Sequence, residues 1–295
     1  MAEPAVVDGA ALMQGWPLRA PQEHSDKEER GTVLVVGGAP GTPGAVLLAG
    51  LAALRVGAGK LTVATTEATA AALAVEVPEA GVLGLPTTRT GGIKPGAADD
   101  LADAARSADA VLIGPGMADA DAARDLVAAL AGQLGPETVL VLDAMATTCG
   151  ALSDPPPGWA SRAVITPNRT EAARVLGHGE DGSAAESDDA VRLAETYGVT
   201  TVLGSHVADP SGSCWRIPKG NAGLGTSGSG DVLAGAVAGI AARSGHPPTA
   251  AMWGLSLHGA AGDRLARRIG PVGYLARELL DELPGCLRDL SLDAA

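Results

Sequence analysis

The chain has 295 residues, 46% of them hydrophobic, which is enough for one large domain or two small ones around a substantial core. Its 21 basic and 34 acidic side chains give a formal net charge of −13, and no basic block stands out, so nucleic acid is not an expected partner. The three cysteines are far apart and show no C-x-x-C spacing, which indicates neither a disulfide framework nor a zinc site.

Residues 1–30 are polar and contain prolines, and we expect them to form an irregular lead-in. They carry no positive region before an apolar segment, which argues against a secretory signal. The most apolar early run, residues 45–58, includes Arg55 and is too short to cross a bilayer. We therefore expect a cytoplasmic protein that does not bind membranes.

The first regular unit is a strand, a glycine-rich loop and a helix. Residues 32–36 are a β-branched and leucine run typical of a buried parallel strand, and residues 44–56 read as a helix that Thr42 caps, with Pro43 at its first position. The loop between them lacks the G-x-G-x-x-G pattern of dinucleotide-binding folds, and Ala45 stands where a P-loop requires lysine. A dinucleotide dehydrogenase and a P-loop NTPase are both disfavoured.

Strand and helix patterns then alternate along the chain. Strands are predicted at residues 60–65, 81–85, 109–113, 138–142, 162–166 and 200–204, and helices at residues 67–76, 97–107, 119–131, 170–176 and 190–197. Asn168 and Glu171 have capping-box spacing at the start of one helix, residues 177–189 read as an exposed loop, and residues 205–217 as a hairpin. This alternation predicts a single α/β domain over residues 31–295, with a mostly parallel sheet covered by helices on both faces.

The C-terminal third begins with a glycine loop, residues 221–231, followed by an apolar helix at residues 232–242 and by helical stretches at 250–269 and 274–283. Glycines at a helix start expose backbone N–H groups and so favour a phosphate or another anion. Asp231 would repel that anion, and a natural role for it is to take a proton from a substrate hydroxyl. The alternative is a tight turn in which Asp231 only caps the helix.

Four segments follow predicted parallel strands and should converge at the carboxyl ends of those strands, where ligands bind in open α/β sheets. They are residues 37–44, residues 114–116, Asp143 and residues 166–168. Each alone has an ordinary explanation, because glycine after a strand often forms a turn and Asp143 is as suited to capping a helix as to binding a ligand. Their shared location is the stronger argument for a site.

Several motifs together carry a family resemblance. They are G-T-V-L-V-V-G-G at residues 31–38, T-P-G-A-V-L-L-A at 42–49, A-A-L-R-V-G-A-G-K at 52–60, G-P-G at 114–116 and G-T-S-G-S-G-D-V-L-A-G at 225–235. With this order and spacing, residues 20–285 resemble the ADP-dependent NAD(P)H-hydrate dehydratases of the ribokinase-like superfamily. The resemblance implies a ribokinase-like fold and a repair reaction, in which ADP phosphorylates the hydroxyl of hydrated NADH or NADPH and phosphate then leaves.

The resemblance also implies roles for individual residues. Asp231 would be the catalytic base, and the anion hole would be formed by the amides of Gly228, Ser229 and Gly230. The hydrate would contact Ala45, Gly116, Asn168 and Asp231. The nucleotide would contact Gly204, Ser205, His206 and Gly230. Mg²⁺ is the implied cofactor, with Glu171 as an indirect contact, and ADP or ATP is the co-substrate. A homo-oligomer such as a tetramer is expected.

The chain departs from the family pattern at three places. Asn168 stands where relatives usually have histidine, Met145 replaces a second aspartate after Asp143, and residues 203–206 contain no lysine. Two other functions therefore stay open. One is a small-molecule kinase of the same superfamily that phosphorylates a hydroxyalkyl heterocycle. The other is a nucleotide-binding homologue that has lost catalysis.

Overall fold

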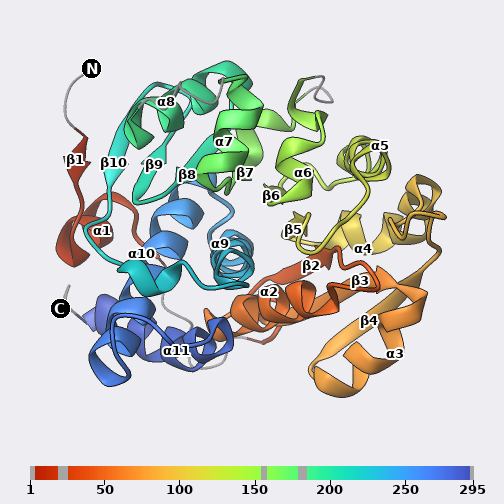
Figure 1. The fold of residues 1–295 in the computed structure, drawn as a ribbon, viewed down its shortest axis with the longest axis horizontal. Helices are drawn as coiled ribbons and strands as arrows, with labels where there is room; N and C mark the ends of the chain where they lie inside the picture. The colour runs from red at the N-terminus through yellow and green to blue at the C-terminus, as the bar shows by residue number, and fades with distance from the viewer. Residues whose placement is uncertain (1–3, 19–25, 154–157, 179–184, 293–295) are drawn as a thin grey trace.

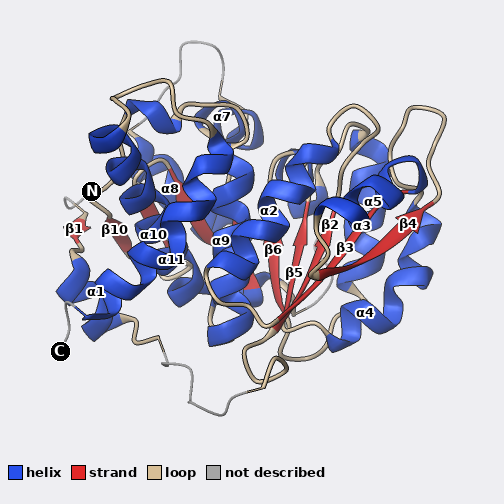
Figure 2. Cartoon of the chain, turned by 90° about the horizontal axis from the view of Figure 1, so that it is seen from below, coloured by secondary structure: helices blue, strands red, loops and turns tan. Residues whose placement is uncertain are grey.

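A ten-stranded β-sheet crosses the molecule and has helices on both faces (Figure 1, Figure 2). The computed structural model describes residues 4–18, 26–153, 158–178 and 185–292. The strand order is β1-β10-β9-β8-β7-β6-β5-β2-β3-β4. All neighbouring strands are parallel except in the pairs β8–β9 and β9–β10, which are antiparallel. The predicted mostly parallel α/β sheet is confirmed, including the hairpin of β9 and β10.

The strands are β1 (Ala5–Val6), β2 (Thr32–Val36), β3 (Lys60–Thr66), β4 (Ala80–Leu85), β5 (Ala110–Ile113), β6 (Val139–Leu142), β7 (Ala163–Ile165), β8 (Thr200–Leu203), β9 (His206–Ala208) and β10 (Cys214–Arg216). The helices are α1 (Gly9–Gly15), α2 (Pro43–Arg55), α3 (Glu67–Glu76), α4 (Ala102–Ser107), α5 (Ala120–Ala131), α6 (Met145–Thr148), α7 (Arg169–Leu176), α8 (Glu186–Tyr197), α9 (Ser229–Ser244), α10 (Pro247–Arg268) and α11 (Ala276–Leu292). None of these described helices is both long and apolar enough to cross a membrane.

Strand β2 shows how the sheet divides the core into two layers. Because side chains alternate between the faces of a strand, Val33 and Val35 point into one buried cluster and Leu34 and Val36 into the other. The first cluster lies under α2, α9, α10 and α11, and the second lies under α5, α6, α7 and α8. A strand buried on both faces has no polar side, which is why its sequence is a continuous apolar run.

Helices α2 and α9 pack very closely on the first face. A Cβ atom on Gly235 would lie 2.1 Å from the carbonyl oxygen of Ala49, and one on Gly239 would lie 2.5 Å from that of Ala53. The two helix backbones therefore touch where glycine of α9 faces alanine of α2. This contact holds the middle of α9, whose N-terminal end follows the glycine loop, against α2.

Several predicted elements differ from the structure. Residues 1–30 are not irregular throughout, because β1 joins the sheet beside β10 and α1 packs against α11. The predicted helix at residues 97–107 is a 3₁₀ helix at Pro95–Leu101 followed by α4. Helix α8 begins at Glu186, inside the predicted loop, and residues 179–184 of that loop lie outside the described residues. Helix α11 continues past Pro284 to Leu292 instead of ending at residue 283.

Candidate active site

The loops that follow the central strands are joined by hydrogen bonds. The amide of Gly38, after β2, donates to the carbonyl oxygen of Pro115, after β5, at 2.8 Å. Thr42 occupies the N-cap position of α2 but makes no side-chain cap, and its hydroxyl donates to the carbonyl oxygen of Gly116 at 2.8 Å. The predicted cap by Thr42 is therefore wrong, and the hydroxyl instead ties the first loop to the G-P-G loop. A Cβ on Gly116 would lie 2.9 Å from that of Ala45, so these two predicted substrate contacts are neighbours.

Asp143 follows β6 and is almost fully buried. Its Oδ1 accepts a hydrogen bond from the hydroxyl of Thr166, after β7, at 2.8 Å. The pKa of Asp143 is raised to about 8, mainly by burial and also by the charges of Asp231 and Glu171, although the Thr166 bond opposes the shift. Asp143, Asp231 and Glu171 are thus close enough to influence one another, and the strand-end segments predicted to converge do converge.

Asp231 lies in the first turn of α9, and the structure excludes one of its two interpretations. The N-cap is Gly228, whose φ of 86° is left-handed and suits glycine, and no side chain caps the helix. Asp231 is the third helical residue and is not the cap, so the capping alternative is wrong. Partial burial and the charge of Glu171 together raise the pKa of Asp231 to about 6. A carboxylate with such a pKa is ionised at neutral pH and still accepts a proton readily.

A buried histidine contacts the start of α9. This contact was not predicted from the sequence. The hydroxyl of Ser229 and Nε2 of His258 on α10 are 2.9 Å apart, and both residues are buried. Burial lowers the pKa of His258 to about 4, so the ring is neutral at pH 7. The amide of Ser229 donates to the carbonyl oxygen of Thr226 at 3.2 Å, whereas the amides of Gly228 and Gly230 have no acceptor among the described residues. Of the three predicted anion-hole amides, two are therefore available in this structure.

A cleft of about 490 Å³ opens beside the start of α9. Five of the predicted site residues line it: Asn168, Gly204, Ser205, Ser229 and Gly230 are among its wall residues. Asn168, predicted as a substrate contact, therefore shares a cleft with residues predicted to bind the nucleotide. Of the four predicted nucleotide contacts, His206 alone is not among the described residues that line this cleft, and its side chain points toward Glu186. The other predicted site residues, Ala45, Gly116, Gly228, Asp231 and Glu171, do not line it either.

Asn168 and Glu171 form a complete capping box at the start of α7. Oδ1 of Asn168 accepts from the Glu171 amide at 3.0 Å, and Oε2 of Glu171 accepts from the Asn168 amide at 2.9 Å. The capping box predicted from their spacing is confirmed, and it occupies one oxygen of Glu171. Among the described residues no group of three or more His, Cys, Asp or Glu side chains could hold a metal ion directly.

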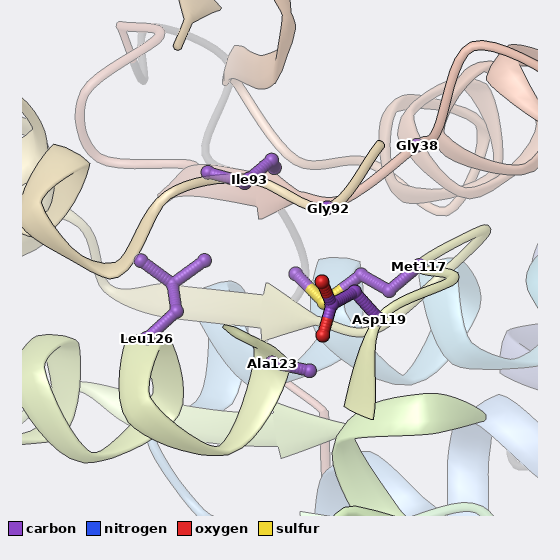
Figure 3. A pocket seen from close by; sticks show the side chains of 7 residues that line it. All are labelled: Gly38, Gly92, Ile93, Met117, Asp119, Ala123 and Leu126. Carbon is purple, nitrogen blue, oxygen red and sulfur yellow. The ribbon is translucent and has the colours of Figure 1, made fainter. Parts of the chain in front are cut away.

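A small cavity of about 10 Å³ lies beside the first glycine loop, between Gly92 and α5 (Figure 3). At its edge, Oδ2 of Asp119 accepts hydrogen bonds from the hydroxyls of Thr88, at 3.1 Å, and Thr90. These bonds, together with the cap that Asp119 forms on α5, lower its pKa. The cavity has room for about one water molecule. The cavity is thus too small for a substrate, and the turn beside it is held in place by the bonds of Thr88 and Thr90 to Asp119.

Comparison with known proteins identifies the family. A family model described as NAD(P)H-hydrate dehydratase matches residues 33–285. The chain belongs to the NAD(P)H-hydrate dehydratase family. The ADP-dependent (S)-NAD(P)H-hydrate dehydratase of Xanthomonas campestris is 47% identical to this family member over 284 residues, which is 94% of either chain. A protein of the same name from Neisseria meningitidis is 35% identical over 89% of this chain and 86% of its own length.

Other relatives are longer or are known as structures. The bifunctional NAD(P)H-hydrate repair enzyme of Moorella thermoacetica is 38% identical over 88% of this chain, which spans only half of that protein. An ADP/ATP-dependent NAD(P)H-hydrate dehydratase from Bacillus subtilis, co-crystallised with ATP and Mg²⁺, has a TM-score of 0.82 and 26% identity, with 98% of this chain and 100% of that chain covered. A ribokinase-like superfamily protein from Enterococcus faecalis has a TM-score of 0.81 at 24% identity, over 97% of this chain and 96% of its own. The predicted family and ribokinase-like fold are confirmed.

Proposed function

We propose that this family member catalyses the ADP-dependent dehydration of (S)-NAD(P)H hydrate, giving NAD(P)H, AMP and phosphate. The observation that carries the proposal is Asp231, a partly buried carboxylate on the first turn of α9. It lies next to two glycine amides that have no acceptor among the described residues, and next to a cleft suited to a nucleotide. The same arrangement in a protein of this family favours a phosphoryl transfer to a hydroxyl group.

In the first step Asp231 would take the proton of the substrate hydroxyl. The hydroxyl oxygen then bonds to the β-phosphorus of ADP, the bond from that phosphorus to the bridging oxygen breaks, and AMP leaves. The amides of Gly228 and Gly230 would stabilise negative charge on the transferring group. In the second step the C–O bond to phosphate breaks and the adjacent ring carbon loses a proton, which restores the double bond of the reduced nicotinamide.

The acceptor would sit over the joined strand-end loops. Ala45 and Gly116 are in contact there, and Asp231 is brought to the same edge by the packing of α9 on α2. Small residues at positions 45 and 116 leave room for a ring to approach. Asn168 lines the neighbouring cleft, from which its side chain would reach the hydrate or the phosphate chain.

The cleft would hold the nucleotide. Its lining residues include the cationic side chains Arg169 and Lys219 and no Asp or Glu, although the chain carries a formal net charge of −13. A cation-bearing cleft on an acidic protein favours an anionic ligand such as ADP or ATP. Gly204 and Ser205 would contact the nucleotide through their backbone, as Gly230 would.

Magnesium would arrive with the nucleotide. Mg²⁺ usually keeps several waters and binds through one or two carboxylates and the substrate phosphates, so it does not require a preformed cage. Glu171 fits an indirect contact, because one of its oxygens is held in the capping box while the side chain stays partly exposed near Asp231. When bound, the ion would neutralise phosphate charge.

The test is to incubate the purified chain with hydrated NADH and Mg²⁺, with either ADP or ATP. Recovery of reduced-nicotinamide absorbance, with one AMP and one phosphate formed per molecule when ADP is used, supports the proposal. A phosphorylated product without recovered absorbance would indicate a kinase, and nucleotide binding without either reaction would indicate a homologue that has lost catalysis. Repeating the assay with hydrated NADPH gives the coenzyme preference.

We also infer a homo-oligomer. Three exposed apolar side chains, Ile269, Val272 and Leu275, lie between α10 and α11, next to Tyr274, which donates a hydrogen bond to Asn221 before the glycine loop. Exposed apolar groups gathered on one short segment favour an interface. Light scattering after size exclusion that gives a monomer mass would overturn this inference.

A further inference from the structure

The two cationic side chains of the cleft have different surroundings. Lys219 follows β10 and also borders a second cavity of about 180 Å³, whose walls include Asp263 and Asp289. Lys219 therefore lies between two cavities, and the walls of the second also carry Arg264 and Arg267. Arg169 opens α7, directly after Asn168, and is not among the residues that line this second cavity.

Glu186 holds the guanidinium of Arg169 by one edge. The Nε–H of Arg169 donates to Oε1 of Glu186 at 2.5 Å, and Oε2 of Glu186 lies 3.6 Å from Nδ1 of His206. The side chain of Glu186 is only 19% exposed. A Cβ on Gly204 would lie 2.4 Å from this carboxylate, so a larger residue at the end of β8 would force the Glu186 side chain to shift. Glu186 is thus fixed between α7, β8 and β9.

The remaining donors of Arg169 have no acceptor among the described residues. Only its Nε makes a hydrogen bond to a described residue, and the side chain is 76% exposed at the cleft wall. A guanidinium held at Nε still presents its terminal N–H groups, which together match the oxygens of a phosphate. The arginine is therefore oriented by one anion and ready to bind another.

We propose that Arg169 binds the phosphate chain of the nucleotide in this cleft and that Glu186 is a positioning residue that orients it. The assignment rests on the proposed function, because it requires that the cleft takes a nucleotide. It predicts that the phosphates lie against the start of α7 as well as against the start of α9. His206 then contributes through Glu186 and not through a direct contact with the nucleotide.

The experiment compares the binding of ADP and of adenosine, measured by calorimetric titration of the purified full chain. Arg169→Gln should weaken ADP binding by about ten- to a hundred-fold, as expected for the loss of a charge-assisted hydrogen bond, and should leave adenosine binding unchanged. Arg169→Lys should restore part of the ADP affinity. Arg174→Gln is the matched control, since Arg174 is an exposed arginine on the same helix that does not line the cleft, and it should bind ADP as the wild type does.

Glu186→Gln tests the positioning role. It should weaken ADP binding in the presence of Arg169 but have no further effect in the Arg169→Gln background, because partners that act through one contact are not additive. Additive losses, a gain in ADP affinity, or a loss of adenosine binding in Glu186→Gln would overturn this role. Thermal unfolding of each variant confirms that it is folded.

Other outcomes separate this inference from the proposed function. Unchanged ADP affinity in Arg169→Gln, together with a large loss in Lys219→Gln, would overturn the assignment and make Lys219 the phosphate contact. If the wild type binds ADP but does not restore hydrated NADH, the proposed reaction fails while the Arg169 assignment is decided by the titrations. If the wild type does not bind ADP, both are overturned.

Discussion

The Asp231→Asn variant removes the proposed base and keeps the shape of the side chain. If Asp231 accepts the hydroxyl proton, turnover should fall by about 10²- to 10⁴-fold, or roughly 3 to 5 kcal/mol in the activation barrier. ADP binding should be retained, because the proposed phosphate contacts are the amides of α9 and the cations of the cleft. Steady-state kinetics with hydrated NADH and titration with ADP measure the two effects separately.

The same substitution should stabilise the fold. Burial and the charge of Glu171 raise the pKa of Asp231 from 3.8 to about 6, so ionising this carboxyl costs more in the folded chain than in the unfolded one. A shift of about two units corresponds to at most about 3 kcal/mol. Asn carries no charge and avoids this cost.

The pH dependence follows from the direction of the shift. Below about pH 4 the carboxyl is protonated in both states and contributes no difference. Between about pH 4 and 6 the unfolded chain has released the proton that the folded chain still holds, so wild-type stability falls as the pH rises. The gain from Asp231→Asn should therefore grow over this range and stay constant above about pH 6. Over the same range, kcat/KM of the wild type should rise about tenfold per pH unit and level off above pH 6.

Urea unfolding of both proteins at pH 4, 6 and 8 measures the stability effect. Asp100→Asn is a suitable control, because Asp100 is exposed and should change neither stability nor turnover. Near-normal turnover in Asp231→Asn would remove Asp231 from the chemistry. Reduced stability at pH 8 would refute the burial argument, since it would mean that the carboxylate is favoured in the folded chain.

Four further substitutions test the surroundings of the site. Asp143→Asn keeps an acceptor for Thr166 and removes a carboxyl whose pKa burial raises to about 8, so its gain in melting temperature should be larger at pH 9 than at pH 5; an equal gain would contradict this. Ala144, with φ of 48° and ψ of −119°, is the one non-glycine residue with positive φ in the described chain. Ala144→Gly should raise the unfolding free energy by about 1 kcal/mol, because relieving strain of ~1–3 kcal/mol exceeds the added chain entropy. Gly235→Ala should lower it by about 1–3 kcal/mol, whereas Gly230→Ala, where a Cβ meets open space, should leave folding intact and slow turnover; equal stabilities of these two variants in urea would refute the packing argument.

Much of the sheet could be predicted because its strands are buried on both faces. The predicted strand at residues 32–36 and the helix at 67–76 have the bounds of β2 and α3. The N-terminal elements could not be predicted, because a two-residue strand has no periodicity and α1 depends on distant contacts. The indole N–H of Trp253 donates to the carbonyl oxygen of Trp16 at 2.7 Å, for example, across 237 positions of sequence.

The last helix was predicted to end before Pro284, and this prediction was wrong because long-range packing was not visible in the sequence. Pro284 lacks the N–H that an interior helical position normally donates, so a helix end near it was the reasonable expectation. In the structure Leu283, Cys286 and Leu290 are all buried along one face of α11. This burial outweighs the local cost, and only the tertiary structure contains that information.

In the site, too, some features could be predicted from the sequence and others depend on the tertiary structure. The convergence of the strand-end loops was predictable because the carboxyl ends of parallel strands lie at one edge of the sheet. The catalytic role of Asp231, inferred from its glycine loop, stays a prediction. The pairs Ser229–His258 and Arg169–Glu186 join residues 29 and 17 positions apart, and no local pattern links them. The cations of the cleft likewise come from positions 169 and 219, not from the nucleotide strand at 203–206 where a lysine was sought.

The small-residue packing between α2 and α9 connects the composition of the chain to its chemistry. Ala45, a predicted substrate contact, lies on α2, and Asp231, the proposed base, lies on α9. The distance between them therefore depends on how closely these two helices approach. At the start of α9, a Cβ on Gly228 would lie 2.7 Å from Cδ1 of Leu48. The glycine loop is therefore itself in contact with α2. A larger residue at this contact would separate the helices and move the base from the acceptor. A misplacement of about 1 Å is enough to reduce catalysis by about a hundred-fold. Substitutions at this buried contact between α2 and α9 should therefore lower turnover even where the chain still folds.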